Sequence, residues 1–588
     1  MSGTAQSESS TVPGATTTIQ ALTPSALAEH LDRSEHFTEP VQACLDEAEA
    51  FPGAACRELD RIGVPRYYVP TALGGCLDDY TNLLRVVRAV SRRDLTVAIA
   101  HVKTFLGGAT SWVAVEESPL GRTEELARGL ADRINGGAVV AWGLTEPGRG
   151  SDLRSAETVA VRTPDGYRLD GRKWPVNNAT RSDLICALAR TGAGSGTRDF
   201  TLLLVDKDEL VPGSYDHLPK ARTLGIRGAD ISGITFNAAM VPEENTVGEP
   251  GSGFELVLKA FQLTRTICAG LSLGAADHAL EVTWHFVRHR HLYGKALRGL
   301  PHARAKFGEL FAAYHVAEAL SMAAGRAVRA LPEEMSVYSA VVKALVPELI
   351  DEMIVGCGEL LGSRAFLRGE LRSGSFQKLE RDHRIVGIFD GNRYVNRQSL
   401  IRQFSKLGMC WQEGEFQEEG LRSVVDPHAP LPGKGRLRLF SRTGCSLLQS
   451  MPCAVEELRA TGVSQDTVRS AQRVLDLCDQ MQARLPTYDT RTARIDAELF
   501  ETSRSYELCV AASSVLHAFL ARANLRRTVT EFDELSLQAA LLFITSRLGG
   551  GPTEKANGVF SAVAEALEVH LDQTLRLPSL MDGEELCR

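Results

Sequence analysis

Apolar residues recur at three-to-four spacing along the first part of the chain, from about Ala21 to Asn135. The segments VQACLDEAEAF and YTNLLRVVRAVSRR show this spacing clearly, and Pro65, Pro70 and a Gly-Gly pair separate them. Such a spacing places apolar side chains on one face of a helix. The pattern predicts a helical N-terminal domain over residues 21–137.

The period changes between Ala138 and Val241, where short apolar runs alternate with turn residues. The runs include AVVAWGL, ETVAVRT, DLICALA and FTLLLVD, and this pattern is typical of an antiparallel β unit. The turn TPDG, Thr163 to Gly166, predicts a hairpin because Asp-Gly readily adopts positive φ. We therefore expect a β domain over residues 138–248.

Long helical pattern resumes after the Gly-rich segment GEPGSG, with Phe254, Val257, Phe261 and Thr264 on one face. Comparable stretches cover residues 304–330 and 336–361, and helices of this length bury their apolar stripes against each other. We expect a bundle over residues 249–407. A segment rich in Gly, Pro and acidic residues, 413–434, then precedes about 150 further helical residues, which predict a C-terminal extension over 408–588.

Composition indicates a soluble globular protein, with 588 residues, 44% hydrophobic and 23% charged. The net charge of -8 argues against a nucleic acid as the main partner, because phosphate contacts need clustered Lys and Arg. The twelve Cys are spread without any CxxC pair, as expected for reduced thiols of a cytoplasmic protein.

The sequence predicts neither an N-terminal signal peptide nor a membrane-spanning segment. Residues 1–20 lack a basic stretch followed by an apolar one, and we interpret them as a disordered lead-in. The most apolar segment, LCVAASSVLHAFLARANL, is interrupted by Ser513, His517 and Arg522, which favours a buried helix over membrane contact.

Two segments carry candidate chemistry. In WGLTEPGRGSD, Gly residues allow close approach of a ligand, and hydroxyls and N–H groups can hold its oxygens; a plain turn is the alternative. In IFDGNRYVNRQ, Asp390 is either a catalytic carboxylate or a solvated turn residue. His285 and His289 have metal-binding spacing but no third ligand, so we expect helix-surface histidines and no metal site.

The first of these segments resembles the flavin loop of the acyl-CoA dehydrogenase family, whose pattern is close to T-E-P-x-x-G-S-D. Further blocks follow in the family's order: DGRKWPVNNATRSDLI, LGIRGADISGITF, VPEENTVGEPGSGFELVLKAFQLTR, RHRHLYGKAL and IFDGNRYVNRQ. The resemblance covers roughly residues 21–404. It implies an α+β multidomain fold, with an N-terminal helical domain, a middle β-barrel, a C-terminal four-helix bundle and here an extra helical extension.

The resemblance also implies FAD as cofactor, lying between barrel and bundle. Asp390 then matches the base that removes the α-proton of an acyl thioester while the β-hydrogen leaves as hydride to flavin N5. Substrate contacts are implied for Ser151, Gln262, Thr264, Arg265 and Gly391. Arg290 matches an Arg that binds pyrophosphate, usually of a neighbouring subunit's cofactor. The full set implied to contact the cofactor is Trp142, Leu144, Thr145, Gly150, Ser151, Trp174, Asn177, Arg290, Tyr293, Glu359, Asn392 and Tyr394.

The chain departs from the family pattern at several of these positions. Asp390 replaces a Glu, which shortens the side chain by one bond of about 1.5 Å. The family's alternative base position is Thr264, which cannot serve. W-I-T becomes Pro175, Val176 and Asn177, the usual Gln-x-x-Gly-Gly-x-Gly becomes ELLGSRA, and Gln262 stands where an Asp often meets pantetheine.

The leading hypothesis is a flavin-dependent dehydrogenase of an acyl thioester, carried by CoA or a carrier protein, in a specialised pathway. The alternatives are a flavin monooxygenase on the same scaffold and a catalytically weak partner subunit. An electron acceptor of unknown identity is implied. The extension resembles one that favours homodimers over homotetramers in longer family members.

Overall fold

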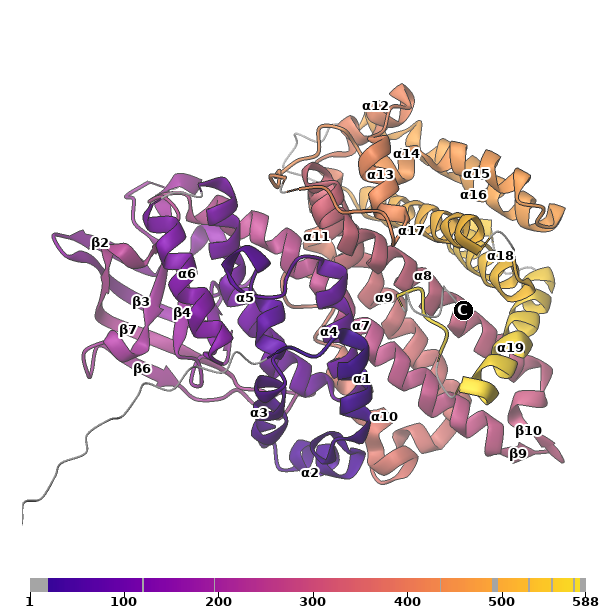
Figure 1. Cartoon of the computed structure of the whole chain (residues 1–588), viewed down its shortest axis with the longest axis horizontal. Coiled ribbons are helices and arrows are strands. Elements are labelled where there is room, and N and C mark those ends of the chain that lie inside the picture. The colour runs from indigo at the N-terminus through magenta and orange to yellow at the C-terminus, as the bar shows by residue number, and fades with distance from the viewer. Residues whose placement is uncertain are drawn as a thin grey trace, which may run out of the picture.

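The computed structural model describes residues 20–118, 121–194, 196–433, 435–488, 495–526, 529–550, 554–574 and 577–581. The predicted lead-in lies outside the described residues except for its last position. Figure 1 shows the sheet at one end of the molecule, the N-terminal helices beside it, and the bundle and extension at the other end. Helices and sheet are segregated along the chain, which confirms the predicted α+β fold class.

The N-terminal part is helical, as the apolar spacing predicts. Asp94 ends one helix and caps the next, because its side chain accepts from Thr96 N at 2.8 Å. That next helix, α5, is buried on nearly every side. The helices of this part are α1 (Pro24–Arg33), α2 (Glu39–Glu47), α3 (Gly53–Arg61), α4 (Tyr80–Arg93), α5 (Leu95–Glu117) and α6 (Arg122–Asn135).

The middle part forms one eight-stranded sheet in the order β6-β7-β3-β2-β4-β5-β8, with β1 paired to β4. Its strands enclose a separate apolar core that includes Ala141, Tyr167, Leu169, Ile185 and Phe236. The strands are β1 (Val140–Gly143), β2 (Val159–Thr163), β3 (Gly166–Asn177), β4 (Leu184–Arg190), β5 (Phe200–Asp206), β6 (Tyr215–Leu218), β7 (Ile231–Pro242) and β8 (Thr246–Val247).

The pairing within this sheet differs in part from the prediction. The hairpin at TPDG is confirmed, since β2 and β3 are antiparallel with Thr163 opposite Gly166. The prediction of an entirely antiparallel unit is wrong. Strand β1 runs parallel to β4, and Val159 of β2 also pairs in parallel with Arg190 of β4. Hydrophobic alternation is the same for both directions, so it cannot distinguish them.

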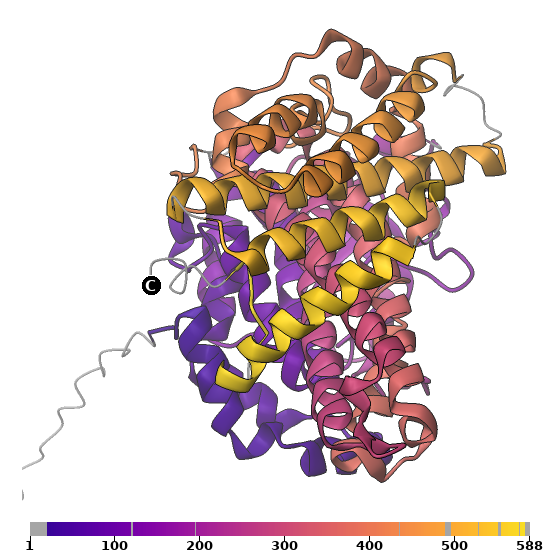
Figure 2. The same ribbon diagram turned by 90° about the vertical axis from the view of Figure 1, so that its right-hand side faces the viewer.

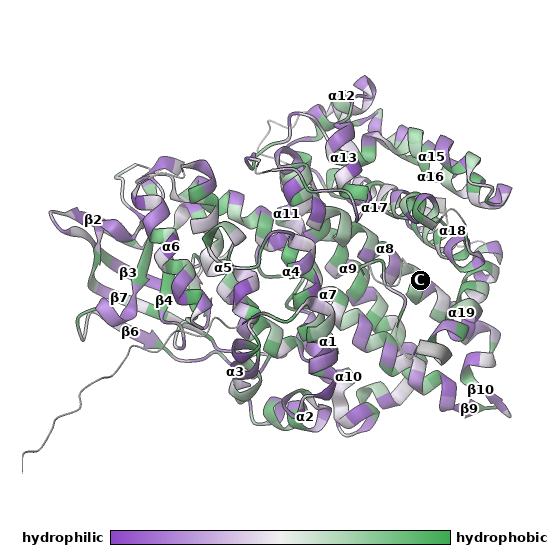
Figure 3. Ribbon diagram, in the orientation of Figure 1, coloured by the Kyte–Doolittle hydropathy of each residue, from purple (hydrophilic) through white to green (hydrophobic). Residues whose placement is uncertain are grey.

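Three long helices pack against one another in the bundle, and Figure 3 shows many hydrophobic positions along them. Arg88 of α4 joins two of them, donating to Asp277 at 2.7 Å and to Glu318 at 2.7 Å. The helices are α7 (Gly253–His289), α8 (Pro301–Ala330), α9 (Met335–Leu361), α10 (Glu370–His383) and α11 (Arg393–Ile401), with a small hairpin of β9 (His291–Leu292) and β10 (Lys295–Ala296).

The extension wraps the bundle, and Figure 2 shows its last three helices lying across one face of it. Helix α12 spans the boundary predicted between residues 407 and 408. The predicted domain boundaries stay predictions. The helices are α12 (Phe404–Glu413), α13 (Glu418–Val425), α14 (Ser446–Gln449), α15 (Met451–Ala460), α16 (Gln465–Gln482), α17 (Ala497–Arg526), α18 (Glu531–Thr545) and α19 (Glu554–Thr574).

Among the described residues, two helices are long and apolar enough to cross a membrane by length and composition alone. In Gly253–His289 and Ala497–Leu525, 89% and 67% of the most apolar window is buried inside the protein. Core helices of a folded domain have the same composition, so the second helix fits the prediction of a buried helix.

Candidate functional site

Asp390 lies in a tight turn between α10 and α11. Its φ is 56° and that of Gly391 is 89°, so two consecutive residues occupy the left-handed region. Arg265 Nε donates to the Asp390 carbonyl at 2.9 Å, and Asn396 donates to the Gly391 carbonyl at 2.8 Å. Asn392 caps α11 by accepting from Val395 N at 3.1 Å. The turn is therefore held from both the bundle and the following helix.

The Asp390 carboxyl points into the protein, because only 11% of its side chain is exposed. Cys268 Sγ donates to Oδ2 across 3.5 Å, and Lys103 Nζ lies 3.7 Å from the same oxygen. A solvated turn residue would have neither contact. Asp390 is therefore a turn residue whose side chain is not solvated, while the role of the carboxyl as a base stays a prediction.

Two lysines that the sequence analysis did not select flank the neighbouring Phe389. Lys103 Nζ of α5 lies 3.6 Å from the ring centroid and Lys343 Nζ of α9 lies 5.2 Å from it. Lys343 also donates to the Val386 carbonyl at 2.6 Å. Burial lowers the pKa of Lys343 to about 8.

Burial also shifts the two α7 residues beside Asp390. It lowers the pKa of Arg265 to about 10, against the opposing effect of the Asp390 carboxylate. Burial, and then the charge of Asp390, raises the pKa of Cys268 to about 12, so this thiol is a neutral donor. The side chains around Asp390 are thus largely buried, and three of them are cations: Lys103, Arg265 and Lys343.

A small apolar cavity of about 10 Å³ adjoins Lys103 and Cys268. Thr264 is fully buried in its wall, and the Thr264 hydroxyl has no hydrogen-bond partner among the described residues. The remaining wall consists of Val87, Ala98, Ile99, Val102, Leu106, Ile267 and Leu271. Helices α4, α5 and α7 thus enclose apolar space next to the carboxyl.

The Gly-rich loop after β1 is tied to β3. Trp174 N donates to the Thr145 carbonyl at 2.9 Å, and the Thr145 hydroxyl donates to the Pro175 carbonyl at 2.8 Å. A buried ion pair that the sequence analysis missed fixes the loop further, with Lys173 Nζ 2.7 Å from Glu146. The only sequence feature that could have predicted this ion pair is a Lys at a strand position expected to be buried. Leu144 is buried, whereas Gly150 and Ser151 are exposed.

Two buried polar atoms beside this loop have no hydrogen-bond partner among the described residues: Trp142 Nε1 and Asn177 Oδ1. Asn177 Nδ2 donates to the Ile99 carbonyl at 3.1 Å, which leaves its oxygen as an acceptor. An indole donor and an amide acceptor suit a planar heterocycle with polar edge atoms. These residues fit a bound flavin ring.

Aromatic packing connects this loop with the Asp390 turn. The Trp142 ring centroid lies 5.1 Å from that of Phe261, and the Arg265 guanidinium lies 4.7 Å from the Phe261 ring. Because Arg265 donates to the Asp390 carbonyl, the Gly-rich loop and the Asp390 turn belong to one packed region. The structure therefore brings together Trp142, Arg265, Gly391 and Asp390.

Other predicted residues lie apart from the Asp390 turn. Arg290 is exposed at the end of α7, Tyr293 is 94% exposed, and Glu359 lies 3.6 Å from Lys306. Tyr394 is half-exposed against Phe500 of the extension. Gln262 donates to the Arg438 carbonyl at 2.7 Å, so an extension segment contacts the position expected to meet pantetheine. Their roles stay predictions.

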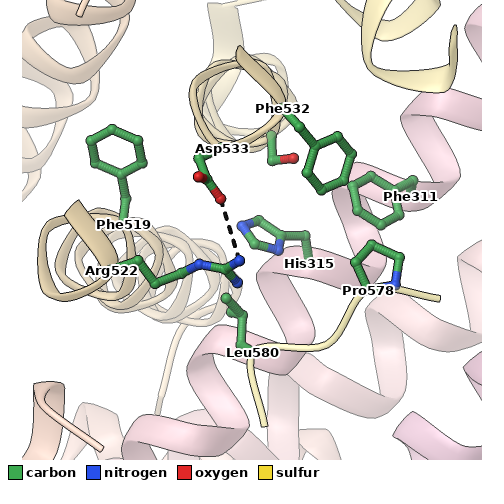
Figure 4. A pocket seen from close by; sticks show the side chains of 9 residues that line it. Phe311, His315, Phe519, Arg522, Phe532, Asp533, Pro578 and Leu580 are labelled. Atoms are coloured by element: carbon green, nitrogen blue, oxygen red, sulfur yellow. Dashed lines mark ion pairs between the residues drawn. The ribbon is translucent and has the colours of Figure 1, made fainter. Parts of the chain in front are cut away.

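Two further cavities involve none of the predicted site residues. The cavity in Figure 4, about 20 Å³, lies between α8, α17 and α18, where Arg522 and Asp533 form an ion pair at 3.3 Å. One of about 150 Å³ lies on the other side of α5, where His101 bonds to Tyr68 at 2.6 Å and to Asp60 at 3.0 Å.

The β domain and the bundle, which meet at the Asp390 turn, each match a known protein family. Residues 141–239 match the acyl-CoA dehydrogenase middle domain, and residues 251–404 match the acyl-CoA dehydrogenase C-terminal domain. The chain belongs to the acyl-CoA dehydrogenase family. Members of this family are FAD-dependent oxidoreductases that act on CH–CH bonds.

Individual relatives agree with this assignment. The mitochondrial short-chain specific acyl-CoA dehydrogenase of Rattus norvegicus is 24% identical over 62% of this chain and 86% of its own. An acyl-CoA dehydrogenase of Bacillus anthracis, solved with FAD, shares 16% identity with a TM-score of 0.66, covering 93% of this chain and 95% of that one. The similarity in fold to the Bacillus anthracis structure therefore extends into the C-terminal extension of this chain.

A carrier-protein enzyme shares the fold over about two thirds of this chain. The prolyl acyl carrier protein oxidase AnaB has a TM-score of 0.56 at 18% identity, covering 64% of this chain and 95% of its own. Solved structures of similar fold thus include one named for a CoA thioester, a butyryl-CoA dehydrogenase, and one named for a carrier-protein thioester.

Proposed function

We propose that this protein is an FAD-dependent dehydrogenase that oxidises the Cα–Cβ bond of an acyl thioester, with Asp390 as the base. The observation that carries the proposal is the buried Asp390 carboxyl beside the apolar cavity and the flavin loop. Bound FAD supplies an acceptor for the β-hydrogen as hydride. Trp142, Thr145 and Asn177 are the residues we expect to hold its ring.

The chain's own residues prepare the proton transfer. Arg265 fixes the turn through the Asp390 carbonyl, so the carboxyl oxygens keep their position during the reaction. The Asp390 carboxyl is largely buried, and a carboxylate held at a fixed position can accept the proton of a weakly acidic Cα–H. Lys103 and the Cys268 thiol, both at Oδ2, hold the carboxyl in its orientation.

We further propose that the protein is a cytoplasmic homodimer and that it passes electrons to a separate acceptor. We do not expect it to bind nucleic acid. Its Arg290 reaches the cofactor of the other subunit, as the exposed position of this residue permits. Because a carrier-protein oxidase has a similar fold, we propose that the substrate is a thioester of either CoA or a carrier protein.

Replacement of Asp390 by Asn tests the base assignment. Asn has nearly the same shape but cannot accept the proton, so we expect flavin reduction by an acyl thioester to slow by about a hundredfold or more. Stopped-flow measurement of flavin bleaching gives the rate. Both proteins should purify with equal flavin content, and equal bleaching rates would exclude Asp390 as the base.

A further inference from the structure

We propose that the acyl thioester reaches this protein on an acidic carrier protein, and that the carrier docks on a segment of the extension, residues 435–443. This inference rests on the proposed function and chooses between the two thioester carriers that it allows. We call residues 435–443 the basic strap. Their sequence, GRLRLFSRT, holds three Arg and neither Asp nor Glu, although acidic residues outnumber Lys and Arg in the whole chain by 73 to 65.

The basic strap lies beside the candidate site. Gln262 Nε2 of α7 donates to the Arg438 carbonyl at 2.7 Å. Arg265, which donates to the Asp390 carbonyl, follows Gln262 by three residues and therefore lies on the same face of α7, about 5 Å along the helix axis. A molecule bound to the strap is thus one helical turn from the Asp390 turn.

The backbone of the strap is fixed against the bundle. Leu437 is 5% exposed and belongs to the main apolar core. Ser441 N donates to Gln403 Oε1 at 2.9 Å, and a Cβ atom added to Gly435 would clash with the Pro332 ring. Because the strap is already ordered, a partner that binds it loses little free energy to loop ordering.

Side chains of the strap alternate between the core and the solvent. The inward side chains are buried or half-buried, and the exposed ones are Arg436, Arg438, Phe440 and Arg442. Among the described residues, no Asp or Glu lies within ion-pair distance of Arg436 or Arg442, and Arg438 has a long contact of 3.4 Å with the half-exposed Glu333. These guanidinium groups are therefore available to the carboxylates of a partner.

The length of this exposed face favours a protein over CoA. Arg436 and Arg442 are six residues apart, which corresponds to at most about 20 Å in an extended chain. CoA carries its phosphates at one end and cannot meet cations along that whole distance, whereas acidic side chains on a protein surface can. Phe440, between these cations, is 59% exposed, and aromatic side chains at the centre of an interface contribute strongly to protein binding.

An acidic segment at the end of the strap sets the position of the carrier. Gln417 Nε2 donates to Thr443 Oγ1 at 3.1 Å, and the neighbouring Glu415, Glu418 and Glu419 are exposed. Like charges repel, so an acidic carrier must bind over Arg436, Arg438 and Phe440 and away from Thr443. This position is the one nearest Gln262 and the Asp390 turn.

Titration calorimetry with a holo carrier protein tests this inference without turnover. The probe is a small acyl carrier protein of negative net charge that bears phosphopantetheine, added to the full-length flavin-loaded protein. We expect Arg436→Glu/Arg438→Glu to weaken its binding by about tenfold or more, and Phe440→Ser to weaken it by about tenfold. An increase from about 50 to about 200 mM NaCl should also weaken wild-type binding, because salt screens exposed charges.

The matched control is Arg168→Glu/Arg222→Glu, which changes the net charge equally at exposed positions of the β domain and should bind the carrier as wild type does. Equal flavin content and melting temperature show that the variants are folded. CoA should bind wild type and Arg436→Glu/Arg438→Glu alike. An equal loss of CoA and carrier affinity would mean that the strap binds phosphate, and that outcome would overturn the inference.

Two further outcomes separate this inference from the proposed function. If wild type does not bind the carrier, or if the strap variants bind it as tightly as wild type, docking on the strap is wrong even when thioesters bleach the flavin. If neither CoA thioesters nor carrier thioesters bleach the flavin, the proposed function fails, whatever the carrier binding shows.

Discussion

At the scale of single residues, the surroundings of Asp390 show how burial changes the chemistry of ordinary side chains. Lys343 is 1% exposed and its ammonium contacts one carbonyl and an aromatic ring. Such a site disfavours the charged form, which is why the pKa of Lys343 falls to about 8. The charged lysine therefore costs stability at neutral pH.

Replacement of Lys343 by Met should stabilise the protein at pH 7, and the gain should disappear at high pH. In wild type the unfolded chain holds the lysine proton up to its ordinary pKa of 10.5, while the folded chain releases it near 8. The contribution of Lys343 to the free energy of unfolding of wild type therefore becomes more favourable as pH increases from 8 to 10.5. The advantage of the variant should shrink by about 3 kcal/mol over this window.

Urea unfolding of wild type and Lys343→Met at pH 7 and pH 10 measures this difference. Subtraction of the two proteins at each pH removes the titration of other groups. A difference that does not change with pH would show that Lys343 is protonated alike in both states.

At the scale of elements, the cavity beside Asp390 depends on how closely α7 packs against α4. A Cβ atom added to Gly274 would lie 2.6 Å from Arg92 N of α4 and closer still to the Arg88 carbonyl. A Cβ atom added to Gly270, one turn earlier on α7, would lie 2.8 Å from the Leu84 carbonyl oxygen. These glycines allow the two backbones to approach, and so fix α4 against the cavity wall.

Gly274→Ala should therefore destabilise the protein by about 3 kcal/mol, because the helices must separate. Thermal unfolding with a flavin-release readout measures the effect. The matched control is Gly129→Ala on α6, where an added Cβ meets nothing within 4 Å. Alanine is the better helix former, so this control should gain about 0.5 kcal/mol. Equal melting temperatures for both variants would contradict the close-packing explanation.

At the scale of the whole molecule, the extension is part of the same folded body as the bundle. Its buried residues join the bundle in one continuous apolar core. Arg397 of α11 forms a buried ion pair with Glu507 of α17 at 2.9 Å, and α11 directly follows the Asp390 turn. The extension thus supports the helix that follows the Asp390 turn, and α17, α18 and α19 pack against α8.

Because the extension covers this face of the bundle, we expect it to block further association, leaving a homodimer. Light scattering of the purified full chain should give twice the chain mass of 63.8 kDa. A mass four times that of the chain would mean that the covered face is not needed for tetramer contacts, and a mass of one chain would contradict the subunit-bridging role proposed for Arg290.

Local pattern in the sequence determined the order of helical, β and helical parts, the hairpin at TPDG, and the choice of Asp390 as the carboxyl to follow. Hydrophobic spacing reports which residues of one segment share a face, and turn residues report where a segment ends. The family was predictable for the same reason, since the residues of each matching motif are consecutive along the chain.

Tertiary structure alone decided what surrounds Asp390. Lys103, Cys268 and Lys343 come from α5, α7 and α9, and each helix is apolar nearly all round. Periodicity cannot indicate which side of such a helix meets a distant turn, because no exposed face marks the direction. The parallel pairing of β1 with β4 was hidden likewise, since alternation is the same in either direction. Packing between distant segments placed the buried cations beside Asp390.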